Sequence, residues 1–206
     1  MARGLASEGV EVTWEKLEPR TPLKFPVGSV PATVLMMLKT FFRQRIPLYA
    51  PSAQCYRHWD LIILGGPTWS YNPSGPILAL MDNYGPAIFA NRKVIVLITC
   101  RGYWRLHLRY LTKRLQRFGT TVVNRIVFTH LNPEPWRTLG VFWKLAGGQP
   151  EKTPVFSRYY RQYGHTLAQL AQARMVGKRL GKALVEGSSL VGLCLDPEDY
   201  TPPMER

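Results

Sequence analysis

The pattern of apolar and polar positions along the chain predicts an α/β domain. Residues 60–66 and 93–99 are continuous aliphatic, β-branched runs, which are typical of strands buried on both faces of a parallel sheet. Residues 121–128 predict another strand, and residues 11–17 alternate between apolar and polar positions as a half-exposed strand does. These four segments form the predicted sheet.

Helical patterns flank these strands. Gly9 suits the left-handed residue that ends a helix, and Gly119 follows an amphipathic stretch in the same way. In the last helix Ala173, Gly177 and Gly181 are spaced four apart, so we expect them to pack closely on the sheet. The predicted helices are residues 2–8, 76–84, 103–118 and 159–186.

Two stretches interrupt this alternation of strands and helices. Residues 19–52 are Pro-broken, apolar and basic at once, and residues 131–156 are rich in Trp, Pro and Gly. We interpret both as insertions over one edge of a single domain that spans residues 1–186. Residues 187–206 turn acidic and Pro-rich, so we expect a loosely ordered tail.

Two segments carry a family resemblance, residues 56–85 (YRHWDLIILGGPTWSYNPSGPILALMDNYG) and residues 91–104 (NRKVIVLITCRGYW). They resemble the third and fourth strands of the flavodoxin-like family, with the loop that follows each strand. The resemblance implies a three-layer α/β fold, with a parallel sheet covered by helices on both faces, and FMN as the cofactor.

A closer likeness is to a flavodoxin-like branch associated with dialkylresorcinol-condensing enzymes. It rests on the LEPRTPLKFP stretch and on the pattern of Cys100, Arg101 and Trp104. This likeness links the chain to aromatic lipid or polyketide metabolism, and it adds a hydrophobic small molecule to the expected ligands.

The chain also departs from the family pattern at its beginning. Flavodoxin-like proteins start with an aliphatic strand and a Ser/Thr/Gly-rich loop that holds the FMN phosphate, and neither precedes residue 11. We expect a truncated N-terminus that binds flavin weakly or not at all. In the strand order 2-1-3-4-5 the absent strand is central, so its neighbours are left with exposed edges unless residues 11–17 move in.

The resemblance places the ligand at the carboxyl ends of the strands ending near Gly66 and Thr99. Trp69 or Tyr71 is expected to stack on the flavin, and Arg101 to face a negative reduced ring or a substrate anion. The alternative is that these aromatic residues only pack against the insertions. The expected cofactor-binding residues are Pro67, Thr68, Trp69, Ser70, Tyr71, Asn72, Thr99, Cys100, Arg101, Gly102, Tyr103 and Trp104.

Other chemistries find less support in the sequence. Cys100 beside Arg101 and a helix N-terminus is either a thiol of lowered pKa or a buried small hydrophobe. The four histidines are scattered without HExxH or a Ser-His-Asp order, so no metal site or hydrolase is predicted. Paired carboxylates are missing from the expected site, which argues against a glycosidase.

The charge is strongly basic, with 27 Lys and Arg against 13 Asp and Glu. Residues 101–182 hold sixteen bases and only Glu134 and Glu151 as acids, which predicts an anionic partner such as an acidic carrier protein or an anionic membrane. Nucleic acid is disfavoured because no helix-turn-helix, OB or RRM signature accompanies the bases. Residues 19–52 could lie on an anionic membrane or gate a lipid-like substrate; the alternative is an insert packed on the sheet.

Three cysteines without CxxC spacing, and no apolar segment long enough for a signal peptide or a membrane span, predict a cytoplasmic protein, at most peripheral to a membrane. The leading functional expectation is a flavodoxin-like, FMN-dependent oxidoreductase or electron carrier. The alternative is a non-enzymatic accessory protein that docks an acidic carrier protein or an anionic membrane through its basic helices.

Overall fold

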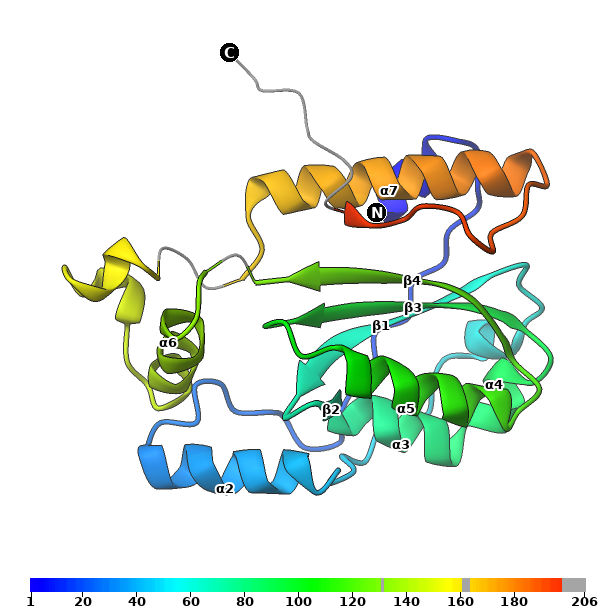
Figure 1. Cartoon of the computed structure of the whole chain (residues 1–206). Coiled ribbons are helices and arrows are strands. Elements are labelled where there is room, and N and C mark those ends of the chain that lie inside the picture. Colours follow the sequence, from blue (N-terminus) through cyan, green and yellow to red (C-terminus); the bar gives the residue numbers. More distant parts are fainter. Residues whose placement is uncertain (131, 161–163, 198–206) are drawn as a thin grey trace, which may run out of the picture.

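The aliphatic runs form the parallel core of an open sheet. A computed structural model describes residues 1–130, 132–160 and 164–197. Its sheet has the order β2-β1-β3-β4, in which β1 (Ile62–Trp69), β3 (Lys93–Cys100) and β4 (Thr121–Thr129) are parallel, and β2 (Asn72–Pro73) folds back antiparallel on β1 (Figure 1). Pro67 pairs with Thr99, and Thr99 with Phe128, so all three parallel strands end at one edge.

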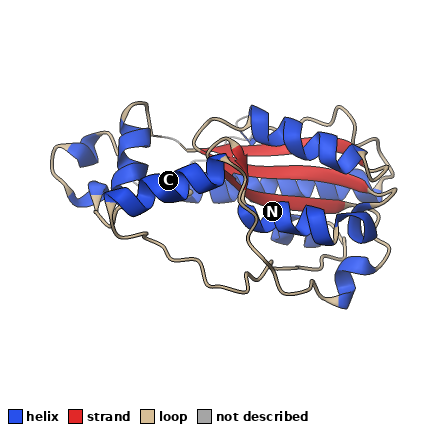
Figure 2. Cartoon of the chain, turned by 90° about the horizontal axis from the view of Figure 1, so that it is seen from below, coloured by secondary structure: helices blue, strands red, loops and turns tan. Residues whose placement is uncertain are grey.

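Helices cover both faces of this sheet (Figure 2). One face carries α1 (Ala2–Ala6) and α7 (Leu167–Val185), while the other carries α3 (Gly75–Asn83), α4 (Gly85–Phe89) and α5 (Arg105–Gln116). The predicted three-layer α/β arrangement of flavodoxin-like type is confirmed. Shorter 3₁₀ turns are η1 (Ala53–Tyr56), η2 (Pro150–Lys152) and η3 (Phe156–Arg158).

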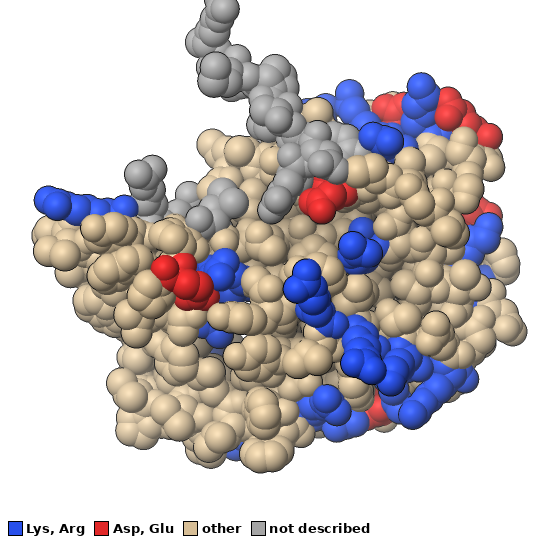
Figure 3. Space-filling model, in the orientation of Figure 1, with Lys and Arg blue, Asp and Glu red and all other residues tan. Residues whose placement is uncertain are grey.

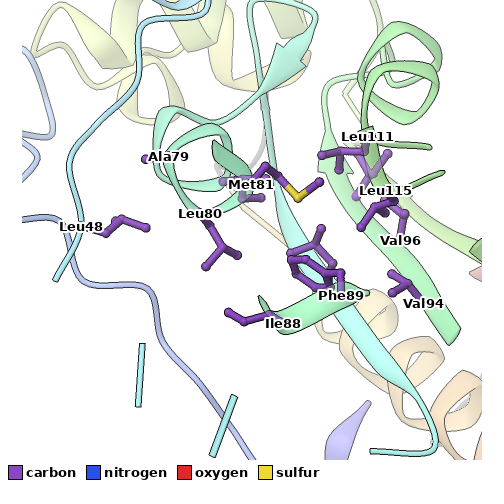
Figure 4. Packing of buried hydrophobic residues seen from close by; sticks show 13 residues of the cluster. Leu48, Ala79, Leu80, Met81, Ile88, Phe89, Val94, Val96, Leu111 and Leu115 are labelled. Carbon is purple, nitrogen blue, oxygen red and sulfur yellow. The ribbon is translucent and has the colours of Figure 1, made fainter. Parts of the chain in front are cut away.

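Because the strands bury both faces, the protein has two hydrophobic clusters. One lies between the sheet and α3, α4 and α5, and Figure 4 shows Met81 and Phe89 packing toward Val94, Val96, Leu111 and Leu115. The other lies under α7, where Val176 and Leu180 meet Ile95 and Ile126. Val94, Ile95 and Val96 are fully buried, so alternate side chains of β3 anchor both clusters.

The small residues of the last helix pack against α1, which corrects the prediction that they face the sheet. A methyl group added to Gly177 would collide with the Met1 carbonyl oxygen, and one added to Gly4 would collide with the Arg174 carbonyl oxygen. The two backbones therefore touch, and Val176 and Leu180 cover the sheet instead. The helix begins at Leu167, later than predicted, because Thr166 and Gln169 form a capping box there.

Residues 11–17 form no strand, so this prediction is wrong. Val10 and Val12 pack in the cluster under α7, whereas Leu17 packs in the cluster on the α3 side. The segment passes from one face of the sheet to the other beside β1 (Figure 1). The alternation of apolar and polar positions in residues 11–17 therefore reflects contacts with two hydrophobic clusters. In the described part of the chain no strand pairs with the outer edge of β1 over residues 62–67.

The two insertions contain α2 (Val30–Phe41) and α6 (Trp136–Leu145). Both helices lie near the carboxyl ends of the strands (Figure 1). The backbone amides of Val27 and Gly28 donate to the Leu145 carbonyl oxygen, which ties the two insertions together.

The beginning of the expected tail is packed. Leu190 and Leu195 are buried in the cluster under α7, and the Asn124 amide on β4 donates to the carbonyl oxygens of Leu190 and Leu193. Loose order is therefore wrong for this part; residues 198–206 lie outside the described residues. No helix in the described ranges is both long and apolar enough to cross a lipid bilayer.

Candidate functional site

A cavity of about 410 Å³ opens at the carboxyl ends of β1 and β3, the edge where ligands bind in open α/β sheets. This volume lies within the range of small-molecule sites. Four chain segments form its wall: α2, the β1–β2 turn, the loop after β3, and α6. The lining residues are Val34, Met37, Leu38, Phe41, Thr68, Ser70, Tyr71, Arg101, Tyr103, Thr138 and Phe142.

The turn between β1 and β2 brings an aromatic side chain to the cavity in a strained backbone. Ser70 and Tyr71 both have positive φ angles, 44° and 69°, which a two-residue hairpin of type I′ requires. Residues other than Gly, Asn and Asp rarely adopt this backbone conformation. The Tyr71 ring meets the Tyr103 ring edge to face, with centroids 5.2 Å apart, so the two strand-end loops share one aromatic wall.

Asn72 fastens α2 over the cavity. Its side-chain amide donates to the carbonyl oxygens of Thr40 and Phe41 at the end of α2, and its carbonyl oxygen accepts from Arg43 Nε at 2.8 Å. The hydroxyls of Thr40 and Ser70 lie 2.7 Å apart and add a second link. Because Asn72 is buried, these bonds are shielded from water and fix the helix to the turn.

Arg101 supplies positive charge to the cavity. It lines the wall, and its Nη1 is buried without a hydrogen-bond partner in the described part of the chain. Because the residue lines the wall, its guanidinium charge would attract an anionic group in the cavity.

His107 supports the cavity from behind. Its Nδ1 lies 2.8 Å from the Thr68 hydroxyl, which lines the cavity, and its ring is fully buried with Nε2 unpartnered in the described residues. Burial lowers the pKa of His107 to about 4, so the ring is neutral at pH 7. Depending on its tautomer, His107 leaves the Thr68 hydroxyl with either an acceptor or a donor to offer a ligand.

The structure brings five of the twelve expected residues to the cavity: Thr68, Ser70, Tyr71, Arg101 and Tyr103. Pro67 and Thr99 are sheet residues, Trp69 pairs with Asn72 across the hairpin, and Gly102 has a φ of 143° beside Arg137. Trp104 lies over the core on the α5 side and lines a separate groove along that helix.

Burial raises the pKa of the Cys100 thiol, outweighing the opposite effects of a hydrogen bond with the Gly102 backbone and of Arg137. The thiol packs against the core on the α3 side. The lowered pKa that its place in the sequence suggested is therefore wrong, and the small-hydrophobe reading describes this side chain.

The sequence analysis proposed residues 19–52 as a gate for a lipid-like substrate but did not assign α2 to the wall of this cavity, and it missed α6 and His107. The insertions showed no period that would reveal which side chains face a ligand. For His107 a signal existed, since it lies three residues after Trp104 and four before Leu111, on the apolar side of α5.

The chain matches no protein-family model, and no curated protein or solved structure is significantly similar to it. The cavity and its lining residues are therefore the basis for a functional assignment.

Proposed function

We propose that the cavity holds the isoalloxazine ring of FMN and that the protein is an FMN-dependent oxidoreductase or electron carrier. The observation that carries this proposal is the joint placement of an aromatic wall, hydroxyl groups and an unpartnered guanidinium nitrogen at the carboxyl ends of two parallel strands. When bound, FMN supplies hydride or single-electron transfer.

The lining fits such a ring in its chemistry. Met37, Phe41 and Phe142 offer apolar surface to a planar ring system, and the hydroxyls of Thr68 and Ser70 can hydrogen-bond with its polar edge. Arg101 would stabilise the negative charge that the ring gains on reduction. His107 would act as a positioning residue, because it contacts the cavity only through Thr68.

The cavity offers fewer binding groups to the FMN phosphate than to the ring. Arg101 is the one Lys or Arg side chain among the lining residues, and no Gly-rich turn follows a strand at the cavity wall. If Arg101 serves the ring, riboflavin and FMN should bind with similar affinity, which separates the two possible uses of this cation.

The proposal is tested by titrating the protein with riboflavin and with FMN, while flavin fluorescence and the reduction potential are followed. We expect weak but saturable binding, in line with the departure from the family's phosphate-binding pattern. We expect Arg101→Gln to weaken binding of the reduced flavin about 10- to 100-fold, more than that of the oxidised form, because a charged hydrogen bond is worth about 1.5–3 kcal/mol. The reduction potential should fall accordingly.

Arg109→Gln is the matched control, since Arg109 is an exposed base on α5 outside the cavity. It should leave flavin binding and potential unchanged. Absence of flavin binding to the native protein, or equal effects of the two substitutions, would refute the proposal.

A further inference from the structure

An apolar platform lies on α2 beside the cavity, and three of its six side chains also line the cavity. The platform consists of large side chains at the surface of α2 and its C-cap, with exposed fractions from 47% for Val34 to 76% for Phe42. Thr33 alone is buried in α2. Its members are Val30, Val34, Leu35, Leu38, Phe41 and Phe42.

This platform is unusual for a helix in contact with water. A surface helix normally turns an apolar stripe to the core and a polar face outward, whereas most large apolar side chains of α2 remain exposed. The contacts of Asn72 with its backbone help to hold the helix in place. Contiguous exposed apolar surface of this kind marks an interaction site.

A basic groove runs along α5. Arg105, Arg109 and Lys113 line it together with Arg125 of β4, and all four side chains are exposed without an ion pair in the described ranges. The guanidinium groups of Arg105 and Arg125 lie 5.5 Å and 5.3 Å from the Trp104 ring. In Figure 3, Lys and Arg gather over α5, while the surface over α2 shows little charge.

One contact links the end of α2 to α5. Arg43, two residues after that helix, places its guanidinium 4.6 Å from the ring centre of Tyr110 on α5. An apolar helix and a row of bases thus lie next to each other on one side of the molecule (Figure 3).

We propose that the apolar platform and the basic groove together dock the protein on an anionic lipid bilayer, with α2 lying in the interface. Apolar and aromatic side chains that enter the acyl boundary beside bases that meet anionic headgroups are the two contributions that hold a helix on a membrane. The inference goes beyond flavin binding and does not depend on it.

Charge favours a bilayer over a second copy of the chain. A net charge of +14 repels like molecules, and a symmetric pairing of platforms would bring two basic grooves close together. An acidic protein would satisfy the bases, but it gives no reason for the exposed Leu35 and Phe42. Since Val34, Leu38 and Phe41 also line the cavity, docking by α2 would place the cavity wall at the bilayer surface.

The test is flotation of the protein with phosphatidylcholine vesicles that contain or lack phosphatidylserine. We expect binding only with phosphatidylserine, weakened by added salt. Arg109→Gln with Lys113→Gln should reduce partitioning about 25-fold, which is about fivefold for each base near an anionic surface. Leu35→Ser with Phe42→Ser should reduce it at least 100-fold, following about 1.5 kcal/mol or more for each of the two buried apolar side chains.

Matched controls lie on α7, which covers the other face of the sheet. Arg174→Gln with Lys178→Gln removes the same charge, and Leu167→Ser with Val185→Ser removes exposed apolar side chains. Neither pair should change vesicle binding. Unchanged thermal unfolding and flavin titration of the Leu35/Phe42 variant would show that its fold and cavity are intact.

Several outcomes would overturn the bilayer proposal. These are no vesicle binding, equal losses in the α7 controls, and losses from the charge substitutions alone, which would indicate docking of an acidic surface. A dimer that Leu35→Ser with Phe42→Ser dissociates, without vesicle binding, would assign the platform to a second copy. Each result is independent of whether flavin binds.

Discussion

Two helices with similar sequences have opposite environments in this protein. Both α3 (GPILALMDN) and α2 (VPATVLMMLKTF) begin with Pro in the first turn and consist mainly of aliphatic residues and Met. In α3 every residue from Gly75 to Met81 is buried, and Leu80 is only 4% exposed. In α2 the equivalent side chains are at the surface, with Leu35 53% exposed.

The difference arises from what each helix lies against. The connection between two parallel strands places α3 on a face of the sheet, where the apolar side chains of β1 and β3 meet it. By contrast, α2 belongs to an insertion and rests on a hairpin turn and on α6. Apolar composition therefore builds the core in one helix, whereas in the other it remains available for a ligand and a partner.

The largest expected effect is on the free energy of unfolding, and it tests the contrast between α3 and α2. Leu80→Ala in α3 should lower the free energy of unfolding by about 2–5 kcal/mol, because it leaves a cavity in a packed core. Leu35→Ala in α2 should change it by less than about 0.5 kcal/mol, since an exposed side chain loses few contacts. Urea denaturation of both variants measures the contrast, and equal losses would show that α2 is part of the core.

The pH dependence of stability tests whether His107 is buried in its neutral form. The pKa of His107 is about 4 in the folded protein against an ordinary 6.5, so its contribution to stability is complete above about pH 6.5. The unfolded chain takes up the proton first as the pH falls, and the free energy of unfolding should drop by about 3 kcal/mol between pH 6.5 and 4.

Urea denaturation across this range checks the expectation, and NMR titration of the His107 ring gives its pKa directly. In His107→Gln the part of the pH slope that belongs to this window should disappear. A slope that stays the same would mean that the pKa of His107 does not differ between the folded and the unfolded chain.

A smaller effect is expected where α2 is fastened. Asn72→Ala removes the amide that binds the carbonyl oxygens of Thr40 and Phe41, and it should cost about 1–3 kcal/mol. Limited trypsin digestion should become faster at Lys39, Arg43 and Arg45. The control is Asn83→Ala at the exposed end of α3, which should leave both the stability and the cleavage rate unchanged.

Sequence patterns predicted the layers well because they are local. The predicted segments show local patterns of their own: an apolar run in β1, β3 and β4, Pro in the first turn of α3, and an amphipathic period in α5. Contacts between distant segments were not predictable in this way. Gly177 packs on α1 rather than on the sheet, and Val12 and Leu17 pack in different cores, although nothing in either local pattern names the partner.

In the candidate site, too, local patterns were predictable from the sequence and contacts between distant segments were not. The rule that ligands lie at the carboxyl ends of parallel strands identified the loops that carry Thr68 and Arg101. The opposite wall depends on hydrogen bonds from one buried side chain, Asn72, to the backbone of α2, and such bonds leave no periodic trace. The insertions showed no period, so the sequence alone did not predict which of their side chains face the cavity.

The docking of residues 190–195 beside β4 affects how the chain can be shortened. A strand at the edge of a sheet has unpaired backbone groups that can pair with strands from other molecules. A segment without strand structure that packs beside it cannot continue this hydrogen-bonded pairing. Asn124 holds that irregular segment through the carbonyl oxygens of Leu190 and Leu193. Expression of a version ending at Gly187 would uncover β4, and we expect such a product to accumulate as insoluble aggregates.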